Sequence, residues 1–438
     1  MIDPSAMPDA GVVVEAGESL ATTRLGIFHR YIWVFLAAFA IAIIATPIMR
    51  RLAIANGIID RPSDPRKVHR VPVAYMGGVA VFLGIMGGTM VSYFATAGGA
   101  LAEVFPSEHM VDGEYHAVVP ISVLMGMAII TIVGLLDDVV GIRPGLKISG
   151  QLIAAAALAI DDVGVQVARG VLRPIGEFLV DRGLLATSDL VFMIPLPGLG
   201  EVPLDVVYWT GAGVIAIFVL GACNAANFID GLDGLLTGTT TITVAGLLVV
   251  ALSLAMIDQG PRDAQRVVLC LAVLGACMGF LPHNFNPASI FLGDCGSMLL
   301  GYCTIVIILT LGDIGQTHLV LAGLMMFAVP IIDATLAIVR RRMAGRSISE
   351  ADDQHLHHML KRALGVKGAV LTLYGIAGCF TVLGVALSLS RARVVYALAL
   401  VVISYLGVTA IKVSRRRHLE EQATLAIGPA EDRSRSAS

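Results

Sequence analysis

The sequence has little charge for its length. Only 14% of its 438 residues are Asp, Glu, Lys or Arg, whereas 56% are hydrophobic, and soluble domains carry about 25% charged residues. A soluble chain of this length would divide into two or three domains, but here the apolar residues form long blocks. The composition argues against a soluble protein and predicts one integral membrane domain.

The sequence also lacks a broad basic surface, paired cysteines and a cleavable signal peptide. A formal net charge of -3 leaves nothing to neutralise a phosphate backbone, so no nucleic-acid partner is expected. The six cysteines show no CxxC spacing and lie in or beside apolar blocks, which favours small buried side chains over disulfides or metal ligands. Residues 1–30 are mixed polar, and the first apolar block is long enough to span a membrane.

Eleven apolar segments approach the roughly 17–25 residues that a bilayer crossing requires. The backbone in hydrocarbon must satisfy its own hydrogen bonds, and the alternating strands of a barrel are absent, so these segments are predicted to be helices. The predicted fold class is an all-α polytopic membrane protein with about 11 transmembrane helices. The segments lie near 31–49, 74–96, 117–136, 146–160, 204–223, 235–257, 266–283, 296–312, 318–339, 369–389 and 394–411.

Lys and Arg are unequally divided between the two sets of alternating connections. The set that begins with 50–73 holds 21 of the 30, so the positive-inside rule predicts that this set is cytoplasmic, with the N-terminus outside and the C-terminus inside. We expect an extracytoplasmic tail at 1–30, a transmembrane domain at 31–411 and a basic, disordered cytoplasmic tail at 412–438. The outer connection 161–203 is predicted to be a short β-hairpin or an irregular cap.

The main polar motifs all fall in the connections predicted to be cytoplasmic. They are the LLDD pair, NAANFIDGLDGL, HNFNPASIFLGDCGS and DDQHLHH. Because the orientation used only Lys and Arg, this shared location is an independent observation, and it predicts one aqueous active site built from several loops. An ion-coupled transporter is the rival interpretation, but it would place its carboxylates in mid-span.

Two adjacent carboxylates, Asp137 and Asp138, end the third predicted span. Neighbouring acids repel one another, and the dipole at a helix C-terminus opposes negative charge. A helix end without function would favour Lys or Arg there, although two acids at the membrane boundary remain the plain alternative. The pair is therefore a candidate for binding a cation or a reacting group.

Asn227, Asp230 and Asp233 are spaced by three residues. On a helical turn this spacing would place all three on one face, and Gly231 and Gly234 would allow close backbone approach to a ligand. Oxygen ligands on such a face suit Mg²⁺ or the polar groups of a nucleotide. The alternative is a Gly- and Asp-rich turn between two spans.

A single carboxylate, Asp294, lies between glycines at the start of a predicted span. Backbone N–H groups and the Ser297 hydroxyl at such a helix start are expected to donate to a phosphate, and Asp294 is expected to hold a metal. Asn284 has an amide able to read a base edge, and Phe291 a ring able to stack on one. An ordinary capped helix start is the alternative.

Histidines and basic residues gather in two other loops. His355, His357 and His358 lack the spacing and cysteine partners of structural zinc, so a phosphate clamp is the preferred interpretation, with surface histidines as the alternative. Lys67 and His69, in the early basic loop, are further candidates for phosphate contacts. Positive-inside charge alone would also explain the basic character of that loop.

Together these stretches resemble the polyprenyl-phosphate N-acetylhexosamine-1-phosphate transferase family. The motifs DRPxxxRKxHRxPVxxxGG, LLDD, NxxNFIDGLDGL, FNPASIFLGDCGS and QHLHH occur in the family's order across about residues 57–365. The QHLHH loop and the span count resemble the branch that uses UDP-GlcNAc more than the branch that uses UDP-MurNAc-pentapeptide. A CDP-alcohol phosphotransferase is disfavoured, because its DGxxAR pattern is missing.

The resemblance implies roles for these residues. The catalytic set would be Asp137, Asp138, Asp230 and Asp233. The metal, Mg²⁺ with Mn²⁺ as a possible substitute, would be held by Asp294 and Asp138. The nucleotide-sugar would be bound by Lys67, His69, Asn227, Asn284, Phe291, His355, His357 and His358, with Asp333 a weaker candidate for the same cavity.

The resemblance also implies a reaction and a location. N-acetylglucosamine 1-phosphate would pass from UDP-GlcNAc to undecaprenyl phosphate on the cytoplasmic face of the inner (plasma) membrane, releasing UMP. The product would be the lipid-linked sugar that starts a cell-envelope polysaccharide such as lipopolysaccharide. The partners would be the UDP-sugar, the polyprenyl phosphate and the bilayer. A homodimer is left open, and so is the choice between direct transfer and an aspartyl-phosphate route.

Overall fold

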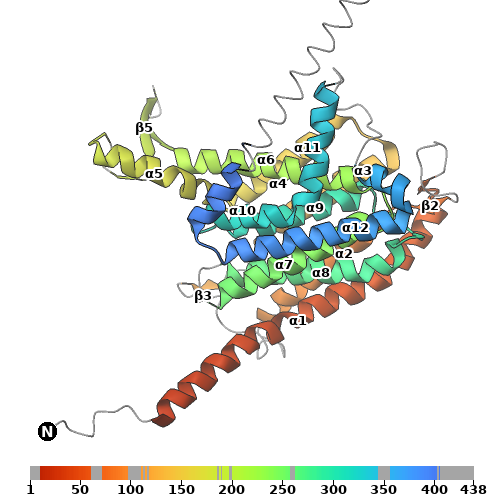
Figure 1. Cartoon of the computed structure of the whole chain (residues 1–438), viewed down its shortest axis with the longest axis horizontal. Helices are drawn as coiled ribbons and strands as arrows, with labels where there is room; N and C mark the ends of the chain where they lie inside the picture. The colour runs from red at the N-terminus through yellow and green to blue at the C-terminus, as the bar shows by residue number, and fades with distance from the viewer. Residues whose placement is uncertain are drawn as a thin grey trace, which may run out of the picture.

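The apolar blocks form helices that run side by side in the computed structural model (Figure 1). The structure describes residues 10–60, 72–96, 110–111, 114–115, 118–184, 187–188, 190–196, 200–256, 262–343, 356–401 and 404, and only the backbone for some of them, among them 10–30. The helices are α1 (Ala10–Ala55), α2 (Gly77–Thr96), α3 (Ile121–Val140), α4 (Pro144–Ile160), α5 (Val167–Asp181), α6 (Val206–Ile229), α7 (Leu235–Ala255), α8 (Asp263–Asn284), α9 (Gly293–Thr310), α10 (Thr317–Met326), α11 (Ala328–Met343) and α12 (Leu356–Ser388).

The described strands are short and form three antiparallel pairs. The pairs are β1 (Ile59–Asp60) with β2 (Val73–Ala74), β3 (Met110–Val111) with β4 (Glu114–Tyr115), and β5 (Val191–Leu196) with β6 (Gly200–Asp205). The protein is therefore mainly helical, as the composition predicts.

The described helices match the predicted membrane segments. Seven are long and apolar enough to cross a bilayer, and α10 with α11, bent by 79°, make an eighth if they form one span. Three shorter apolar helices cover Gly77–Tyr93, Pro144–Ile160 and Ala392–Val401. Each of the eleven predicted segments overlaps one of these helices. The all-α polytopic architecture is confirmed, whereas eleven crossings and the orientation of the two termini stay predictions.

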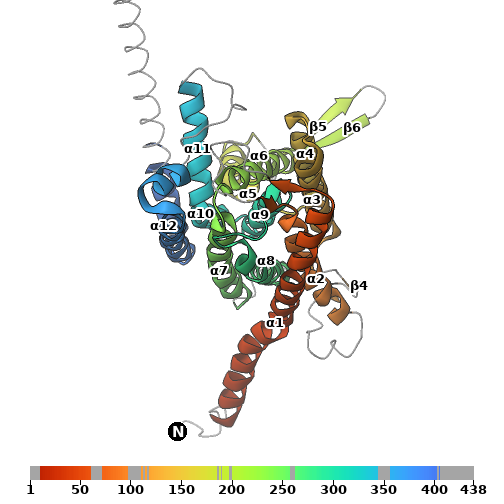
Figure 2. The same ribbon diagram turned by 90° about the vertical axis from the view of Figure 1, so that its right-hand side faces the viewer.

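Helix α9 is the centre of the bundle. Every residue from Cys295 to Thr310 is buried, and α9 contacts α2, α3, α6, α7, α8 and α10. Figure 2 looks nearly along these helices and shows α9 inside the ring that they form. A helix that is apolar all round is expected to be buried in this way. The polar residues at its two ends, Asp294 and Asp313, are consequently held in fixed positions.

The connection predicted to be a hairpin or cap contains both a hairpin and a helix. Strands β5 and β6 pair from Val191↔Asp205 to Leu196↔Gly200, which confirms the hairpin. Helix α5 was not predicted, although its apolar residues recur at helical spacing, and Pro174 lies inside it. Both elements lie at the end of the bundle opposite β2 (Figure 1).

The prediction for the cysteines is right for five of the six. All six are free, and all except Cys379 are buried. They therefore serve as small apolar side chains in the packed helices.

Candidate active site

The end of α3 is built around Asp137. The helix stops at Gly141, whose positive φ of 66° turns the chain and whose N–H donates to the Asp137 carbonyl at 2.9 Å. The Asp137 side chain then accepts a hydrogen bond from the Ile142 N–H at 2.9 Å through Oδ1. Its other oxygen, Oδ2, lies 2.7 Å from Nζ of Lys147 on α4. The carboxylate is thus fixed on both sides.

Lys147 joins the carboxylates of two helices. Its ammonium also donates to Oδ2 of Asp294 on α9, and the carboxyl groups of Asp137 and Asp294 are themselves within hydrogen-bonding reach. The positive charge offsets the repulsion that two neighbouring acids would otherwise suffer. Sequence reasoning missed Lys147, although a lone charged residue in the predicted span 146–160 is a signal of function.

Asp138 caps the first turn of α9. Its Oδ1 and Oδ2 accept hydrogen bonds from the N–H groups of Asp294 at 2.8 Å and Cys295 at 3.0 Å. Gly293 makes this approach possible, because it has a φ of +73° and a Cβ there would lie 2.5 Å from Asp138 Oδ2. Two N–H groups of this helix start therefore donate to a carboxylate of the protein itself. Donation by the neighbouring glycines and the Ser297 hydroxyl to a substrate phosphate stays a prediction.

The contacts of Asp137 and Asp138 explain how adjacent acids persist at a helix end. Lys147 compensates the first, and the positive end of α9 compensates the second. The expected cation is therefore present for Asp137, as Lys147, whereas the described partners of Asp138 are backbone N–H donors. Whether Asp138 also binds a metal stays a prediction.

The turn between α6 and α7 carries the next acids. Helix α6 ends at Ile229, Asp230 is its C-cap residue, and Gly234, with φ +78°, begins α7. The prediction that Asn227, Asp230 and Asp233 share one helical face is therefore wrong. The helix ends four residues before Asp233, at the first of two Asp-Gly pairs, so such a face does not form.

Two residues of this turn nevertheless reach the carboxylate cluster. The Asn227 side chain hydrogen-bonds to Asp294. Burial, together with the negative charges of Asp294, Asp138 and Asp233, raises the pKa of Asp230 to about 8. A carboxyl group whose ionised form is unfavourable indicates a place where a bound cation would be stabilising.

Asp233 and Asn284 hold the loop that precedes α9. Asp233 Oδ2 accepts hydrogen bonds from Asn286 Nδ2 at 2.9 Å and the Ala288 N–H at 3.0 Å. Asn284 is buried, accepts from the Thr237 hydroxyl at 3.0 Å and donates to the Ile290 carbonyl at 3.1 Å. Their catalytic and base-reading roles stay predictions. The contacts observed are within the protein.

His357 lies beside the same turn. The histidine is buried and its Nδ1 is 3.7 Å from Oδ2 of Asp333, while Oδ1 of Asp333 accepts the Leu356 N–H at 2.8 Å. On its other side, Nε2 faces Gly231 so closely that a Cβ there would clash with it. Asp333 therefore fixes the start of α12 and lies beside the imidazole. His358 is adjacent, its ring centroid 4.3 Å away.

Aromatic contacts complete this end of the bundle. The Phe291 ring meets Tyr75 edge-on at 6.1 Å between centroids, and the Tyr75 hydroxyl hydrogen-bonds to Asp60. Arg341, at the end of α11, lies 5.3 Å from the centroid of the Phe228 ring. Tyr75 and Arg341 were not predicted. Lys67, His69 and His355 lie outside the described residues.

The arrangement suits phosphate chemistry. Carboxylates from α3, α9 and the α6–α7 turn converge with the ammonium of α4 at one end of the bundle. Hard oxygen ligands of this kind favour Mg²⁺, and Lys147 favours an anion. Within the described ranges no three His, Cys, Asp or Glu side chains form a complete metal-binding cluster, so any ion would take further ligands from substrate or water.

The sequence matches known proteins over the same elements. The family described as Glycosyl transferase family 4 matches residues 120–312, which include α3 to α9. The protein named "Probable undecaprenyl-phosphate N-acetylglucosaminyl 1-phosphate transferase" of Bacillus subtilis (strain 168) is 30% identical over 361 residues, covering 82% of this chain and 85% of its own length. The chain belongs to the polyprenyl-phosphate N-acetylglucosamine-1-phosphate transferase family. As a transferase of this family, it is a membrane enzyme.

Two other relatives of this transferase show the breadth of the match. "Decaprenyl-phosphate N-acetylglucosaminephosphotransferase" of Mycolicibacterium smegmatis is 32% identical over 388 residues, with 84% of this chain and 85% of the relative covered. "Phospho-N-acetylmuramoyl-pentapeptide-transferase" of Desulforudis audaxviator is 27% identical over 365 residues, with 80% and 95% covered. The relatives' names share a phosphosugar transfer and differ in sugar and in prenyl carrier.

Proposed function

We propose that this transferase moves N-acetylglucosamine 1-phosphate from UDP-GlcNAc to undecaprenyl phosphate at the cytoplasmic membrane face, with Mg²⁺, and releases UMP. The observation that carries the proposal is the Asp137–Lys147–Asp294 cluster at one end of a membrane bundle. A lipid phosphate enters from the bilayer and a nucleotide-sugar from water, so a polar cluster at a bundle end is where the two substrates can meet.

Catalysis of this reaction depends more on neutralising the charges of the substrates than on protein groups that form bonds to them. A phosphate oxygen of the acceptor attacks the β-phosphorus of the donor, a new P–O bond forms, and the bond to the UMP oxygen breaks with its electron pair. Both reactants are anions, so catalysis depends on neutralising and aligning them. Lys147 supplies a cation to the phosphates. The acceptor phosphate has a second pKa of about 6, so Asp137 need only orient it.

The carboxylates fit a divalent ion of this kind. Mg²⁺ is usually held by one or two carboxylates together with substrate phosphates and water, and Asp294 with Asp138 or Asp230 offers that number. When bound, the ion would polarise the diphosphate and neutralise part of its charge. Asn227, which hydrogen-bonds to Asp294, would keep that carboxylate oriented.

His357 and Arg341 suit a donor that carries a diphosphate. Both are buried beside the α6–α7 turn and bring nitrogen donors close to the place where the diphosphate would lie. Nothing among the described residues there offers a platform for a peptide. The relatives named for N-acetylglucosamine support UDP-GlcNAc as the donor, and those named for decaprenyl phosphate keep this shorter carrier as an alternative.

A donor and acceptor panel tests the proposal. Purified protein in detergent with Mg²⁺ would receive UDP-GlcNAc, UDP-GalNAc or UDP-MurNAc-pentapeptide, each with undecaprenyl or decaprenyl phosphate, and UMP release would be measured. We expect the highest initial rate with UDP-GlcNAc and none with Asp294→Asn. A faster reaction with the pentapeptide donor would assign the protein to the branch that uses UDP-MurNAc-pentapeptide. If no pair of substrates released UMP, the proposed reaction would be refuted.

A further inference from the structure

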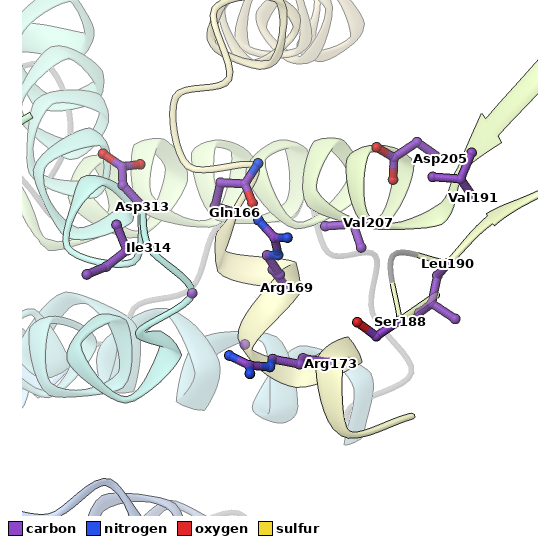
Figure 3. A pocket seen from close by; sticks show the side chains of 12 residues that line it. Gln166, Arg169, Arg173, Ser188, Leu190, Val191, Asp205, Val207, Asp313 and Ile314 are labelled. Atoms are coloured by element: carbon purple, nitrogen blue, oxygen red, sulfur yellow. The ribbon is translucent and has the colours of Figure 1, made fainter. Parts of the chain in front are cut away.

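A second polar cavity lies far from the carboxylate cluster. It encloses about 840 Å³ among α5, the start of α6 and the loop after α9. Figure 3 shows Gln166, at the start of α5, and Arg169 and Arg173 of α5 between Asp313 on one side and Asp205 on the other. A volume of this size is typical of pockets that bind small ligands.

The cavity is at the opposite end of the central helix from the active site. Asp294 is in the first turn of α9 and Asp313 follows its last residue. The 18 residues of α9 span about 27 Å at 1.5 Å per residue. If the active site faces the cytoplasm, this cavity faces the other side of the membrane, so it is not a part of the catalytic machinery.

Helix α5 presents a basic face to the cavity. Gln166, Arg169 and Arg173 are spaced by three and four residues, so they share one side of the helix. The first turn of α5 is anchored, because the Thr317 hydroxyl donates to the Val167 carbonyl at 2.9 Å. Arg173 pairs with Glu177 at 2.8 Å, but both side chains are more than half exposed, and such surface pairs contribute little.

Both acids that line the cavity have partners within the protein. Asp313 is nearly buried, and its Oδ2 is 3.2 Å from Arg262 Nε and 3.9 Å from an Arg266 nitrogen. Asp205 accepts the Tyr208 N–H at 3.0 Å and caps the start of α6. Arg169 and Arg173 bring two guanidinium groups to the wall of the cavity, and guanidinium groups bind phosphate oxygens well.

The rim of the cavity is apolar. Val191 and Ile314 line it, yet 44% and 50% of their surfaces are exposed. Exposed apolar side chains beside a cationic pocket fit an amphiphile better than a soluble anion. The helices next to the cavity, α6 and α9, are membrane-span candidates, so a membrane lipid is the amphiphile expected beside it.

We propose that this cavity binds the anionic phosphate headgroup of a phospholipid, with Arg169 and Arg173 contacting the phosphate and Val191 and Ile314 the start of the acyl chains. The site is independent of the proposed transfer reaction. It would anchor α5 and the hairpin to the leaflet on that side.

Lipid retention tests the proposal directly. The full-length protein would be placed in nanodiscs of phosphatidylglycerol and phosphatidylcholine, released into the gas phase, and its bound lipids counted by native mass spectrometry. The test variant is Arg169→Gln with Arg173→Gln. The matched control is Arg182→Gln, which removes an arginine of the same segment that is stacked 4.9 Å from the Phe178 ring centroid and does not line the cavity. UMP release checks that each variant is folded.

We expect phosphatidylglycerol retention to fall by roughly tenfold or more in the double variant, the loss expected for a charged hydrogen bond. Retention should be unchanged in Arg182→Gln and kept when both arginines become lysine. Equal retention in the parent and the double variant would overturn the proposal. So would thermal stabilisation by inorganic phosphate that depends on these arginines without any preference for phosphatidylglycerol, because the ligand would then be a soluble anion.

Discussion

The carboxylate of Asp138 accepts hydrogen bonds from the backbone of Asp294 and Cys295, at 2.8 and 3.0 Å. A side chain at the end of one helix thereby fixes the first turn of another. Since Asp294 is in that turn, Asp138 determines where its carboxylate points. The two acids are 156 residues apart in the sequence and act as one unit.

The first prediction concerns this cap. Asp138→Asn keeps one acceptor oxygen but turns an amide donor toward backbone N–H groups, so we expect lower stability by about 1 kcal/mol, as for a lost helix cap. The rate should fall by about two orders of magnitude because Asp294 is no longer held. Thermal melting and UMP release check both effects, with the exposed acid Asp181→Asn as control. Unchanged melting and rate would show that the cap has no role.

The second prediction concerns Lys147. Lys147→Met leaves the carboxylates of Asp137 and Asp294 without their shared cation, so we expect the rate to fall by about a hundredfold or more, as when a preorganised charge is removed. Lys147→Arg should recover part of the lost rate, because a guanidinium group keeps the positive charge but differs in shape from an ammonium group. Initial rates of UMP release check this, with the exposed Lys367→Met as control. A rate within threefold of the parent in Lys147→Met would contradict the assignment.

The sequence predicted the acids of this cluster because charge is rare in an apolar chain. Asp137, Asp138 and Asp294 lie at the ends of apolar helices, where they are conspicuous and energetically unfavourable without a partner. Lys147 is also a rare charge in an apolar segment, but in the sequence it contributes only to the count of Lys and Arg from which the orientation is predicted. Its partners are on α3 and α9, and no local pattern in the sequence names them.

Tertiary contacts account for what could not be predicted. The spacing of Asn227, Asp230 and Asp233 suggested one helix, but the glycines end α6 first, and Asp233 then binds the loop before α9. Asn284 looked available for a base, yet Thr237 and Ile290 use its amide. Local spacing predicts candidates, whereas the partner of a buried polar group depends on distant parts of the chain.

The third prediction concerns the metal. Chelation with EDTA should abolish UMP release, and added Mg²⁺ or Mn²⁺ should restore it, because two anions must be neutralised for the attack. Asp294→Asn should be inactive at every metal concentration, with a melting temperature close to that of the parent. Thermal melting without nucleotide, in the same detergent, checks that the variant is folded. Turnover in EDTA, or full activity of Asp294→Asn, would refute the metal assignment.

The fourth prediction concerns Asp333 and His357, which lie 3.7 Å apart. His357→Ala should lower kcat more than it raises KM, since a clamp on the diphosphate acts mainly in the transition state. Asp333→Asn should lower kcat by a smaller factor, because it only positions the imidazole and the start of α12. The double variant should resemble His357→Ala alone, as expected for residues that act together. Thr335→Ala, an exposed change on the same helix, is the control, and additive losses would contradict the coupling.

The last prediction concerns orientation, because every proposed role depends on which compartment holds the active site. In a Cys379→Ser background, Thr187→Cys on the α5 side and Lys367→Cys on α12 would each provide one exposed thiol at opposite ends of the bundle. An impermeant maleimide should label Thr187→Cys in intact cells and Lys367→Cys only after permeabilisation, since 21 of the 30 Lys and Arg belong to the connections predicted to share the side of Lys367. The reverse labelling would place the carboxylate cluster outside the cytoplasm. UDP-sugars are made in the cytoplasm, so a transferase in that orientation would be separated from its donor, and the proposed reaction would fail together with the topology.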